Sequence, residues 1–239
     1  QIQAWGWRLP FIFSAFLAVL GLRMRLSVGP NECQEIASVS ESGPVKRLVK
    51  HYKKSLLQAF CILSIAGVLA GMLSIFLVGY LEHFLLMSPA SAVGLYLAVA
   101  LVMLLSFTLG AFIADYFNIH RQWLVVGLMI IMLTSFPAFK AMQYPGVIRI
   151  VAVILFASVS YFSIASFPPM LIELFPRDIR YSGVAIMYGI SFSIIAGTTP
   201  LVMSGLIARF STIAPFSYIV FASALALAAV LFGKERYVI

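Results

Sequence analysis

Charged residues are scarce in this chain of 239 residues, since 10% of them are Asp, Glu, Lys or Arg. A typical soluble domain has about 25%, so these charges are too few to cover a water-facing surface. Charge is absent altogether from seven stretches, 9–22, 55–81, 84–114, 122–139, 150–172, 181–208 and 210–233. Six of them reach the length of about 18 residues that an α-helix needs to cross a membrane. The sequence therefore predicts an all-α polytopic membrane protein with seven transmembrane helices.

Cysteine and histidine are also rare, and their spacing excludes a disulfide framework and a metal site. Cys33 lies in a polar segment and Cys61 in an apolar run, while His51, His83 and His120 fall in three separate places. No group of them has the spacing of a zinc site. A nucleophile with its base, a phosphate loop and a haem-type histidine pair are also missing. We therefore expect no cofactor and no enzymatic activity.

The net charge of +8 raises the question of a nucleic-acid partner, but basic loops that set membrane topology explain it better. Residues 45–54 hold most of the positive charge of the long polar segment 23–54. Within and after them, Leu48, Tyr52 and Leu56 recur at helical spacing. This pattern predicts an amphipathic helix on an anionic membrane surface, with nucleic-acid binding as the less favoured alternative.

Lys and Arg in the gaps between the stretches predict the orientation of the chain. Twelve lie on one side and four on the other. The side with twelve is expected to be cytoplasmic and to carry the C-terminus. The chain begins with Gln1, and its first apolar run follows almost at once, so we expect a further portion upstream. Seven spans with an outer N-terminus also describe a receptor, so motifs must decide between these classes.

One loop carries a recognisable motif. Its sequence, ELFPRDIRYSG at 173–183, fits the pattern E-x-F-P-x-x-x-R-x-x-G. The pair Pro168-Pro169 precedes it, and Tyr188 and the run GTTP at 197–200 follow it. Together with WGWRLPF at 5–11, these residues resemble the metabolite:proton symporter branch of the major facilitator superfamily, of the proline/betaine transporter type.

The resemblance implies that the seven spans correspond to helices 6–12 of a twelve-helix major facilitator fold. Residues 1–27 would be the last helix of the N-terminal bundle, 28–54 the central cytoplasmic loop and 55–239 the C-terminal six-helix bundle. It implies a secondary active transporter in a bacterial inner membrane, moving proline, betaine or an organic acid with protons by alternating access. Its partners would be the small-molecule substrate, protons, the lipid bilayer and a missing N-terminal half.

The sequence departs from the family pattern in three places. The loop that usually contains G-x-x-x-D-R-x-G-R-R keeps only Asp115 and a displaced Arg121. Gly189 stands where Asn is common after the tyrosine, and Ala196 replaces the first glycine of a Gly-Gly pair. These departures bear on the substrate more than on the fold.

Opposite charges at the predicted inner helix ends suggest a cytoplasmic gate. Glu173 and Arg180 flank Pro176, and Asp115 and Arg121 flank the neighbouring turn. Pairs of this kind could lock the inner face in one state and separate in the other. The alternative is that they are exposed loop ion pairs that fix topology and contribute about 0–1 kcal/mol.

Polar residues inside the predicted spans are candidates for the substrate pathway, because hydroxyls can donate to a carboxylate and aromatic faces can hold a quaternary ammonium. The alternative for each is helix–helix packing, where small hydroxyl residues are common. The candidates are Tyr80, Tyr161, Tyr188, Ser163 and Thr198. Prolines and glycines that weaken two spans are hinge candidates: Pro168, Pro169, Gly189, Gly197 and Pro200. For the pair Gly67 and Gly71, packing and hinge functions are both open.

The interiors of the predicted spans hold no Asp, Glu, Lys or Arg. A proton-coupled carrier usually needs a titratable group within the membrane, so we expect its proton site in the missing half. Two alternatives stay open: a seven-helix receptor or sensor, and a non-transporting remnant of a split transporter gene.

Overall fold

The computed structural model describes residues 5–27, 44–177 and 179–233. The chain divides into two units, 1–43 and 44–239. The described part of the first unit consists of the 3-10 helix η1 (Gly6–Arg8) and helix α2 (Leu9–Ser27). Arg8 lies over the ring of Trp5, with its guanidinium carbon 4.9 Å from the ring centroid.

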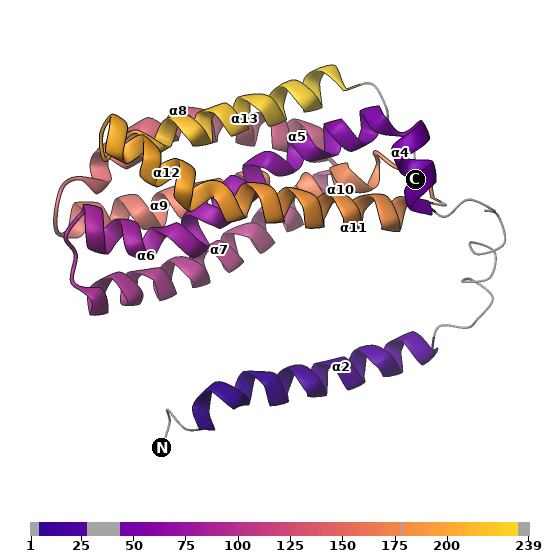
Figure 1. Cartoon of the computed structure of the whole chain (residues 1–239), viewed down its shortest axis with the longest axis horizontal. Coiled ribbons are helices and arrows are strands. Elements are labelled where there is room, and N and C mark those ends of the chain that lie inside the picture. Colours follow the sequence, from indigo (N-terminus) through magenta and orange to yellow (C-terminus); the bar gives the residue numbers. More distant parts are fainter. Residues whose placement is uncertain (1–4, 28–43, 178, 234–239) are drawn as a thin grey trace. The chain divides into compact units, whose positions relative to one another are not determined.

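Six helical rods make up most of the second unit (Figure 1). The short basic helix α4 (Pro44–His51) precedes them. The rods, each given by its segments in chain order, are α5 (Lys53–Ala70), η2 (Gly71–Phe76), α6 (Leu77–Gly79) and η3 (Tyr80–Phe84); α7 (Pro89–Phe117); α8 (His120–Met142); α9 (Val147–Ile164) and α10 (Phe167–Ile172); α11 (Arg180–Ser191), η4 (Phe192–Ala196) and α12 (Gly197–Arg209); and α13 (Pro215–Phe232). The described residues contain no strand.

All six rods are long and apolar enough to cross a membrane. They coincide with the last six of the seven predicted spans, so the prediction of long apolar helices in these stretches is confirmed. The prediction of seven transmembrane helices is not confirmed. Residues 9–22 lie in α2, and its apolar part, Phe11–Met24, is shorter than the six candidate membrane spans. A straight crossing needs about 20 residues. The proposed central loop lies largely outside the described residues, at 28–43.

Small residues let the rods pack closely around α9. Helix α9 packs against both α7 and α8, and α13 packs against both α5 and α8. Gly110 on α7 lies against the carbonyl oxygen of Phe162, and Gly127 on α8 lies against that of Ser163. A side chain at either glycine would collide with the α9 backbone, so these glycines serve packing.

Three of the rods are interrupted inside the bundle. The first contains the π-helical segments η2 and η3, and the fifth contains the π-helical segment η4. The α9–α10 rod breaks at Ala165–Ser166, because Pro168 and Pro169 have no backbone N–H to continue the hydrogen-bond ladder. Segments of π-helix often occur at functional sites. The use of these interruptions as hinges stays a prediction.

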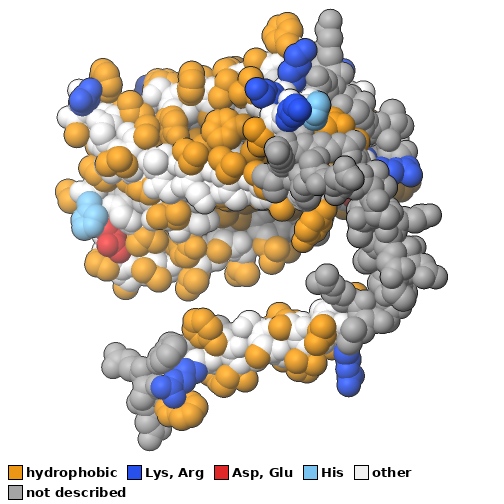
Figure 2. Space-filling view, turned by 45° about the vertical axis from the view of Figure 1, so that its right-hand side comes forward, with side chains coloured by type: hydrophobic (Ala, Val, Ile, Leu, Met, Phe, Trp, Pro, Cys, Tyr) orange, Lys and Arg blue, Asp and Glu red, His pale blue; other side chains and the backbone are white. Residues whose placement is uncertain are grey.

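On the face of the bundle seen in Figure 2, the middle is covered by hydrophobic side chains, and the visible charged side chains lie toward the two ends. Many large hydrophobic side chains of α7 and α8 are exposed, among them Leu101 at 65% and Leu133 at 76%. Surface of this kind is expected where lipid rather than water solvates the protein. The prediction of an integral membrane protein is supported by this surface and by the six apolar helices.

Candidate substrate cleft and helix-end contacts

Five aromatic rings, each from a different segment (α7, α9, α10, α11 and η4), form a continuous cluster inside the bundle. We call it the aromatic cluster: Tyr161, Phe107, Phe167, Tyr188 and Phe192. Neighbouring centroids are 6.4, 6.3, 5.9 and 5.3 Å apart in that order, within the range of favourable ring contacts. The cluster joins two of the three tyrosines that the sequence suggested for the substrate pathway.

A cavity of about 360 Å³ opens beside this cluster, and we call it the aromatic cleft. Its volume lies in the range of small-molecule sites, about 300–1,000 Å³. Residues from α5, α7, α9, α10 and η4 line it: Ala66, Ala70, Ala100, Met103, Leu104, Phe107, Tyr161, Ile164, Phe167 and Phe192. The lining residues on α5 are both alanines, and three aromatic rings, those of Phe107, Tyr161 and Phe167, contribute to the lining from α7, α9 and α10.

Tyr161 brings polar character to this otherwise apolar cleft. Ser74 on η2 and Tyr96 on α7 lie close enough to interact with its hydroxyl. Apolar lining with a few placed polar groups is typical of sites that bind small molecules. The arrangement can orient a small ligand with both an apolar or cationic part and a hydrogen-bonding part.

Tyr188 also lines a second, more polar cavity of about 480 Å³. This cavity includes Arg177 and Arg180, and one guanidinium nitrogen of Arg180, Nη2, is buried without a hydrogen-bond partner. Tyr188, a member of the aromatic cluster, therefore connects the cluster to the cavity that holds Arg177 and Arg180. Guanidinium groups bind carboxylates well, so this end of the cluster suits a ligand with an acidic group.

The remaining pathway candidates lie elsewhere. Ser163 faces α8, where it lines a different cavity with Trp123 and Gly127. Thr198 is exposed and donates to the carbonyl oxygen of Ile194 at 2.6 Å. The structure does not bring these two side chains to the aromatic cleft.

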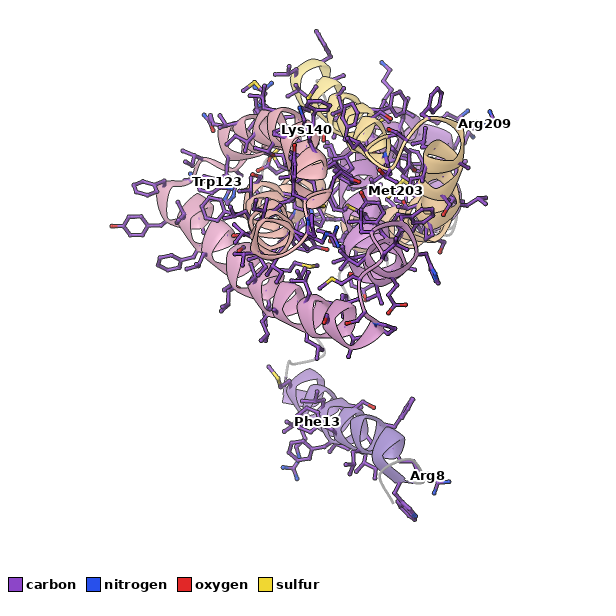
Figure 3. All side chains as sticks on the ribbon, turned by 90° about the vertical axis from the view of Figure 1, so that its left-hand side faces the viewer. Arg8, Phe13, Trp123, Lys140, Met203 and Arg209 are labelled. Atoms are coloured by element: carbon purple, nitrogen blue, oxygen red, sulfur yellow. The ribbon has the colours of Figure 1, made fainter. Side chains whose placement is uncertain are left out.

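Tyr80 is the first residue of η3. Figure 3 looks onto the end of the bundle where Lys140 of α8 and Arg209 of α12 lie. The Tyr80 side chain is fully buried. The hydroxyl donates to the carbonyl oxygen of Thr212 at 2.8 Å and accepts from Nε2 of Gln143 at 3.0 Å. Thr212 Oγ1 in turn donates to Oε1 of Gln143 at 2.8 Å. We call these three residues the Tyr80 network. Through it, the Tyr80 hydroxyl links the two turns that contain Gln143 and Thr212.

The hinge candidates fall into two groups. Gly189 and Gly197 have open space where a Cβ would be. Pro200 cannot bond the carbonyl oxygen of Ala196, and that oxygen lies near Gly71, whose Cβ would be 2.7 Å from it. Gly71 thus lets η2 approach η4 and α12 closely. Packing is the function that the structure supports for Gly71.

Neither predicted gate pair lies within ion-pair distance in this structure. Asp115 is 3.7 Å from Nε2 of His120, and Nη2 of Arg121 donates to the last turn of α13, at the carbonyl oxygen of Val230 (3.2 Å). Cations stabilise such helix ends because they satisfy free carbonyls and complement the helix dipole. Arg180 donates from Nε to the carbonyl oxygen of Phe175 at 3.0 Å. The gate stays a prediction for another conformation.

The motif at 173–183 is organised around Phe175, which is fully buried. A Cβ at Gly183 would lie 2.8 Å from its ring carbon Cδ1. Phe175 also accepts a hydrogen bond from Arg180 through its backbone carbonyl oxygen. The phenylalanine, arginine and glycine of the motif therefore form one structural unit at this turn.

A metal site needs several His, Cys, Asp or Glu side chains close together in the fold. Among the described residues, no three His, Cys, Asp or Glu side chains come together as a metal site would require.

Two known proteins are similar to parts of this chain. One is the inner membrane metabolite transport protein YhjE of Escherichia coli (strain K12), 34% identical over 68 residues, which cover 27% of this chain and 16% of the relative. Another is the glycine betaine/proline/ectoine/pipecolic acid transporter OusA of Dickeya dadantii (strain 3937), 28% identical over 148 residues, 57% of this chain and 29% of the relative. No family model matches the chain.

The matched parts span less than a third of either relative's length. Both relatives are named as transporters rather than enzymes. With the six apolar helices, these similarities support an integral membrane protein with a role in membrane transport. The similarity to a metabolite transporter and to a betaine/proline transporter agrees with the resemblance seen in the motifs.

Phe107, Phe167 and Phe192 were not among the predicted site residues, because a phenylalanine in an apolar run is equally consistent with a lipid-facing position. One signal was available: Tyr188 and Phe192 are four residues apart, which places them on the same helix face. Gln143 and Thr212 were also absent from the predicted site residues, and they lie in turns whose approach depends on tertiary packing.

Proposed function

We propose that this chain is the C-terminal portion of a secondary transporter of the major facilitator type, of the proline/betaine:proton symporter branch. It would comprise the last helix of the N-terminal bundle and the whole C-terminal bundle. The substrate would be a small zwitterion such as proline or betaine, or an organic acid. The C-terminus would face the cytoplasm of a bacterial cell.

The aromatic cleft is the observation that carries this proposal. The faces of its rings can hold an ammonium or quaternary ammonium group. The Tyr161 hydroxyl can donate to a carboxylate, and the positive charge of Arg177 and Arg180 near Tyr188 favours an acidic group at the adjoining cavity. A molecule with a cation and a carboxylate a few bonds apart fits the ring faces and the Tyr161 hydroxyl together.

Alternating access would use the interrupted rods. Binding sites in such transporters lie between bundles near the midplane, often next to broken helices. The π-helical segments η2 and η4 and the break before Pro168 lie in rods that contribute to the cleft. The proton site is expected in the N-terminal half, since the apolar interiors of these rods have no acidic residue.

Uptake of labelled proline, betaine and a dicarboxylate tests the proposal, in cells expressing the coding sequence of residues 1–239 with its upstream portion. We expect Tyr161→Ala and Tyr188→Ala to raise KM for one substrate at least tenfold, about 1.4 kcal/mol. Tyr144→Ala, at an exposed tyrosine outside the cleft, is the matched control. An uncoupler that dissipates the proton gradient should abolish accumulation.

Two results would contradict the proposal. If Tyr161→Ala and Tyr188→Ala transport every substrate as well as Tyr144→Ala does, neither the aromatic cleft nor the cavity at Tyr188 is the substrate site. If the coding sequence has no further membrane spans before Gln1 and the protein transports none of the three substrates, a receptor or sensor is the better explanation.

A further inference from the structure

An apolar groove runs between α5 and α13 at the basic end of the bundle. Its volume is about 450 Å³. Cys61, Ala228 and Ala229 contribute small side chains to it, while Leu57 and Phe232 lie at 66% and 80% exposure. Cys61 follows Lys54 by seven positions along the helix, so the groove is roughly 10 Å long at 1.5 Å per residue. That length reaches from a helix end well into one leaflet.

The end of this groove is basic. Lys54 lines it, and Lys50, His51 and Lys53 are exposed beside it along the chain. Figure 2 shows such side chains gathered at one end of the bundle. Residues 44–61 and 225–233 contain no Asp or Glu, so no acidic side chain from the two walls neutralises this charge.

The position of these basic residues is fixed by packing. Leu48 of α4 is fully buried in the core of the bundle, and the N–H of Tyr52 donates to the carbonyl oxygen of Leu48 at 2.9 Å. Gln58 donates from Nε2 to the carbonyl oxygen of Ala229 at 3.1 Å, which joins the two walls of the groove. The helix that carries Lys50 and the start of α5 are therefore anchored, with their cations directed away from the core.

We propose that this groove binds an anionic phospholipid. One acyl chain lies along the apolar walls formed by α5 and α13, and the phosphate lies at Lys54 with Lys50 and Lys53 nearby. Charge complementarity selects the occupant, because an apolar groove with a basic mouth and no acidic residue in its two described walls matches an apolar tail with a negative head. The proposal does not depend on the substrate or on transport.

Photo-crosslinking in lipid nanodiscs tests this proposal on the 239-residue chain. Two probes carry the same diazirine-labelled acyl chain, one as phosphatidylglycerol and one as phosphatidylcholine, and crosslinked peptides are mapped by mass spectrometry. We expect phosphatidylglycerol to label 57–61 and 225–233 in preference to phosphatidylcholine. Lys54→Gln should lower that labelling about fivefold, the equivalent of about 1 kcal/mol for one lysine at an anionic surface.

Lys140→Gln is the matched control, because it removes the same charge from an exposed lysine on another helix, α8, and it should leave the labelling unchanged. Ala228→Leu, at an exposed position on the groove, fills the space without changing charge and should reduce labelling by both probes. Equal labelling by the two headgroups together with no effect of Lys54→Gln overturns the proposal. Absence of lipid crosslinks in the groove, or competition by free glycerol phosphate, overturns it as well.

Discussion

Arg180 contacts the carbonyl oxygen of Phe175, with its Nε 3.0 Å from that oxygen, rather than the carboxylate of Glu173. The guanidinium is bound at one side, while its Nη2 is buried and unpartnered. Arg180 therefore stabilises the turn in this conformation and keeps a donor available for an acid. The two uses can be separated by mutation.

We expect Arg180→Gln to lower the free energy of unfolding of the chain by about 1–3 kcal/mol, because the carbonyl oxygen of Phe175 loses a charged donor. Glu173→Gln should change it by no more than about 0.5 kcal/mol, since no ion pair within the described residues depends on it. Thermal unfolding in detergent measures both. An equal loss in the two variants would mean that Glu173 supports Arg180 in this state.

The gate hypothesis makes a different prediction for transport by the longer protein. Glu173→Arg should impair uptake, and adding Arg180→Glu should restore part of it if the two charges pair in another conformation. If the double variant is no better than Glu173→Arg alone, the pairing idea fails.

Replacing Gly71 or Gly189 by alanine is expected to change the stability of the chain in opposite directions. A Cβ at Gly71 would lie 2.6 Å from Cβ of Thr199, so Gly71→Ala should destabilise the chain by about 1–3 kcal/mol. Gly189 has open space around it in helix α11, so Gly189→Ala should stabilise by about 0.5–1 kcal/mol. Thermal unfolding of both variants tests this difference. Stabilisation by Gly71→Ala would contradict the close packing of η2 on α12.

If Gly189 is also a hinge, Gly189→Ala should slow uptake by the longer protein while raising its stability. Gly205→Ala is the control, because Gly205 also has open space and lies in the same rod. Equal uptake by both variants would remove Gly189 from the hinge candidates.

The Tyr80 network predicts a structural effect rather than a loss of substrate binding. Tyr80→Phe removes the donor to the carbonyl oxygen of Thr212 and the acceptor for Gln143, so we expect a loss of about 1–3 kcal/mol in stability. Tyr218→Phe is the control, because no hydrogen bond within the described residues involves its hydroxyl. KM for transport should be unchanged in Tyr80→Phe. A higher KM with unchanged stability would return Tyr80 to the substrate pathway.

The charge-free stretches of the sequence predicted the helical rods well. An uncharged run longer than about 18 residues has few structural options in lipid. The span 56–80, for example, lies within the rod Lys53–Phe84. The span 9–22 shows the limit of this signal, since it is shorter and depends on its flanks.

The candidate site was less predictable, because it depends on which helix faces which. Tyr161 and Tyr188 were chosen for their chemistry, but only packing shows that Phe107 and Phe167 connect them. Likewise, the sequence places Arg121 beside Asp115, whereas the fold brings the end of α13 to Arg121. Contacts between distant segments carry no local signature in a single sequence.

Arg149, in the first turn of α9, shows how a charge near a helix end can become part of the structure. It is 9% exposed and donates to three carbonyl oxygens, those of Met142 at 2.9 Å, Leu85 at 2.9 Å and Gln143 at 3.4 Å. The next residue after Leu85, Leu86, has φ of 53°, a left-handed conformation that a leucine rarely adopts. Arg149 thus holds the turn before α7 against α8.

We expect Arg149→Gln to destabilise the chain by about 2–5 kcal/mol, because buried carbonyl oxygens lose charged donors. Arg149→Lys should recover only part of this, since an ammonium cannot reproduce the planar fork of a guanidinium. Arg209→Gln removes a charge from an exposed arginine on α12 and should stay within about 0.5 kcal/mol of the wild type. Thermal unfolding measures the three variants, and hydrogen exchange at residues 85–92 locates the change. Full recovery by lysine would show that charge alone, and not the fork of donors, stabilises this turn.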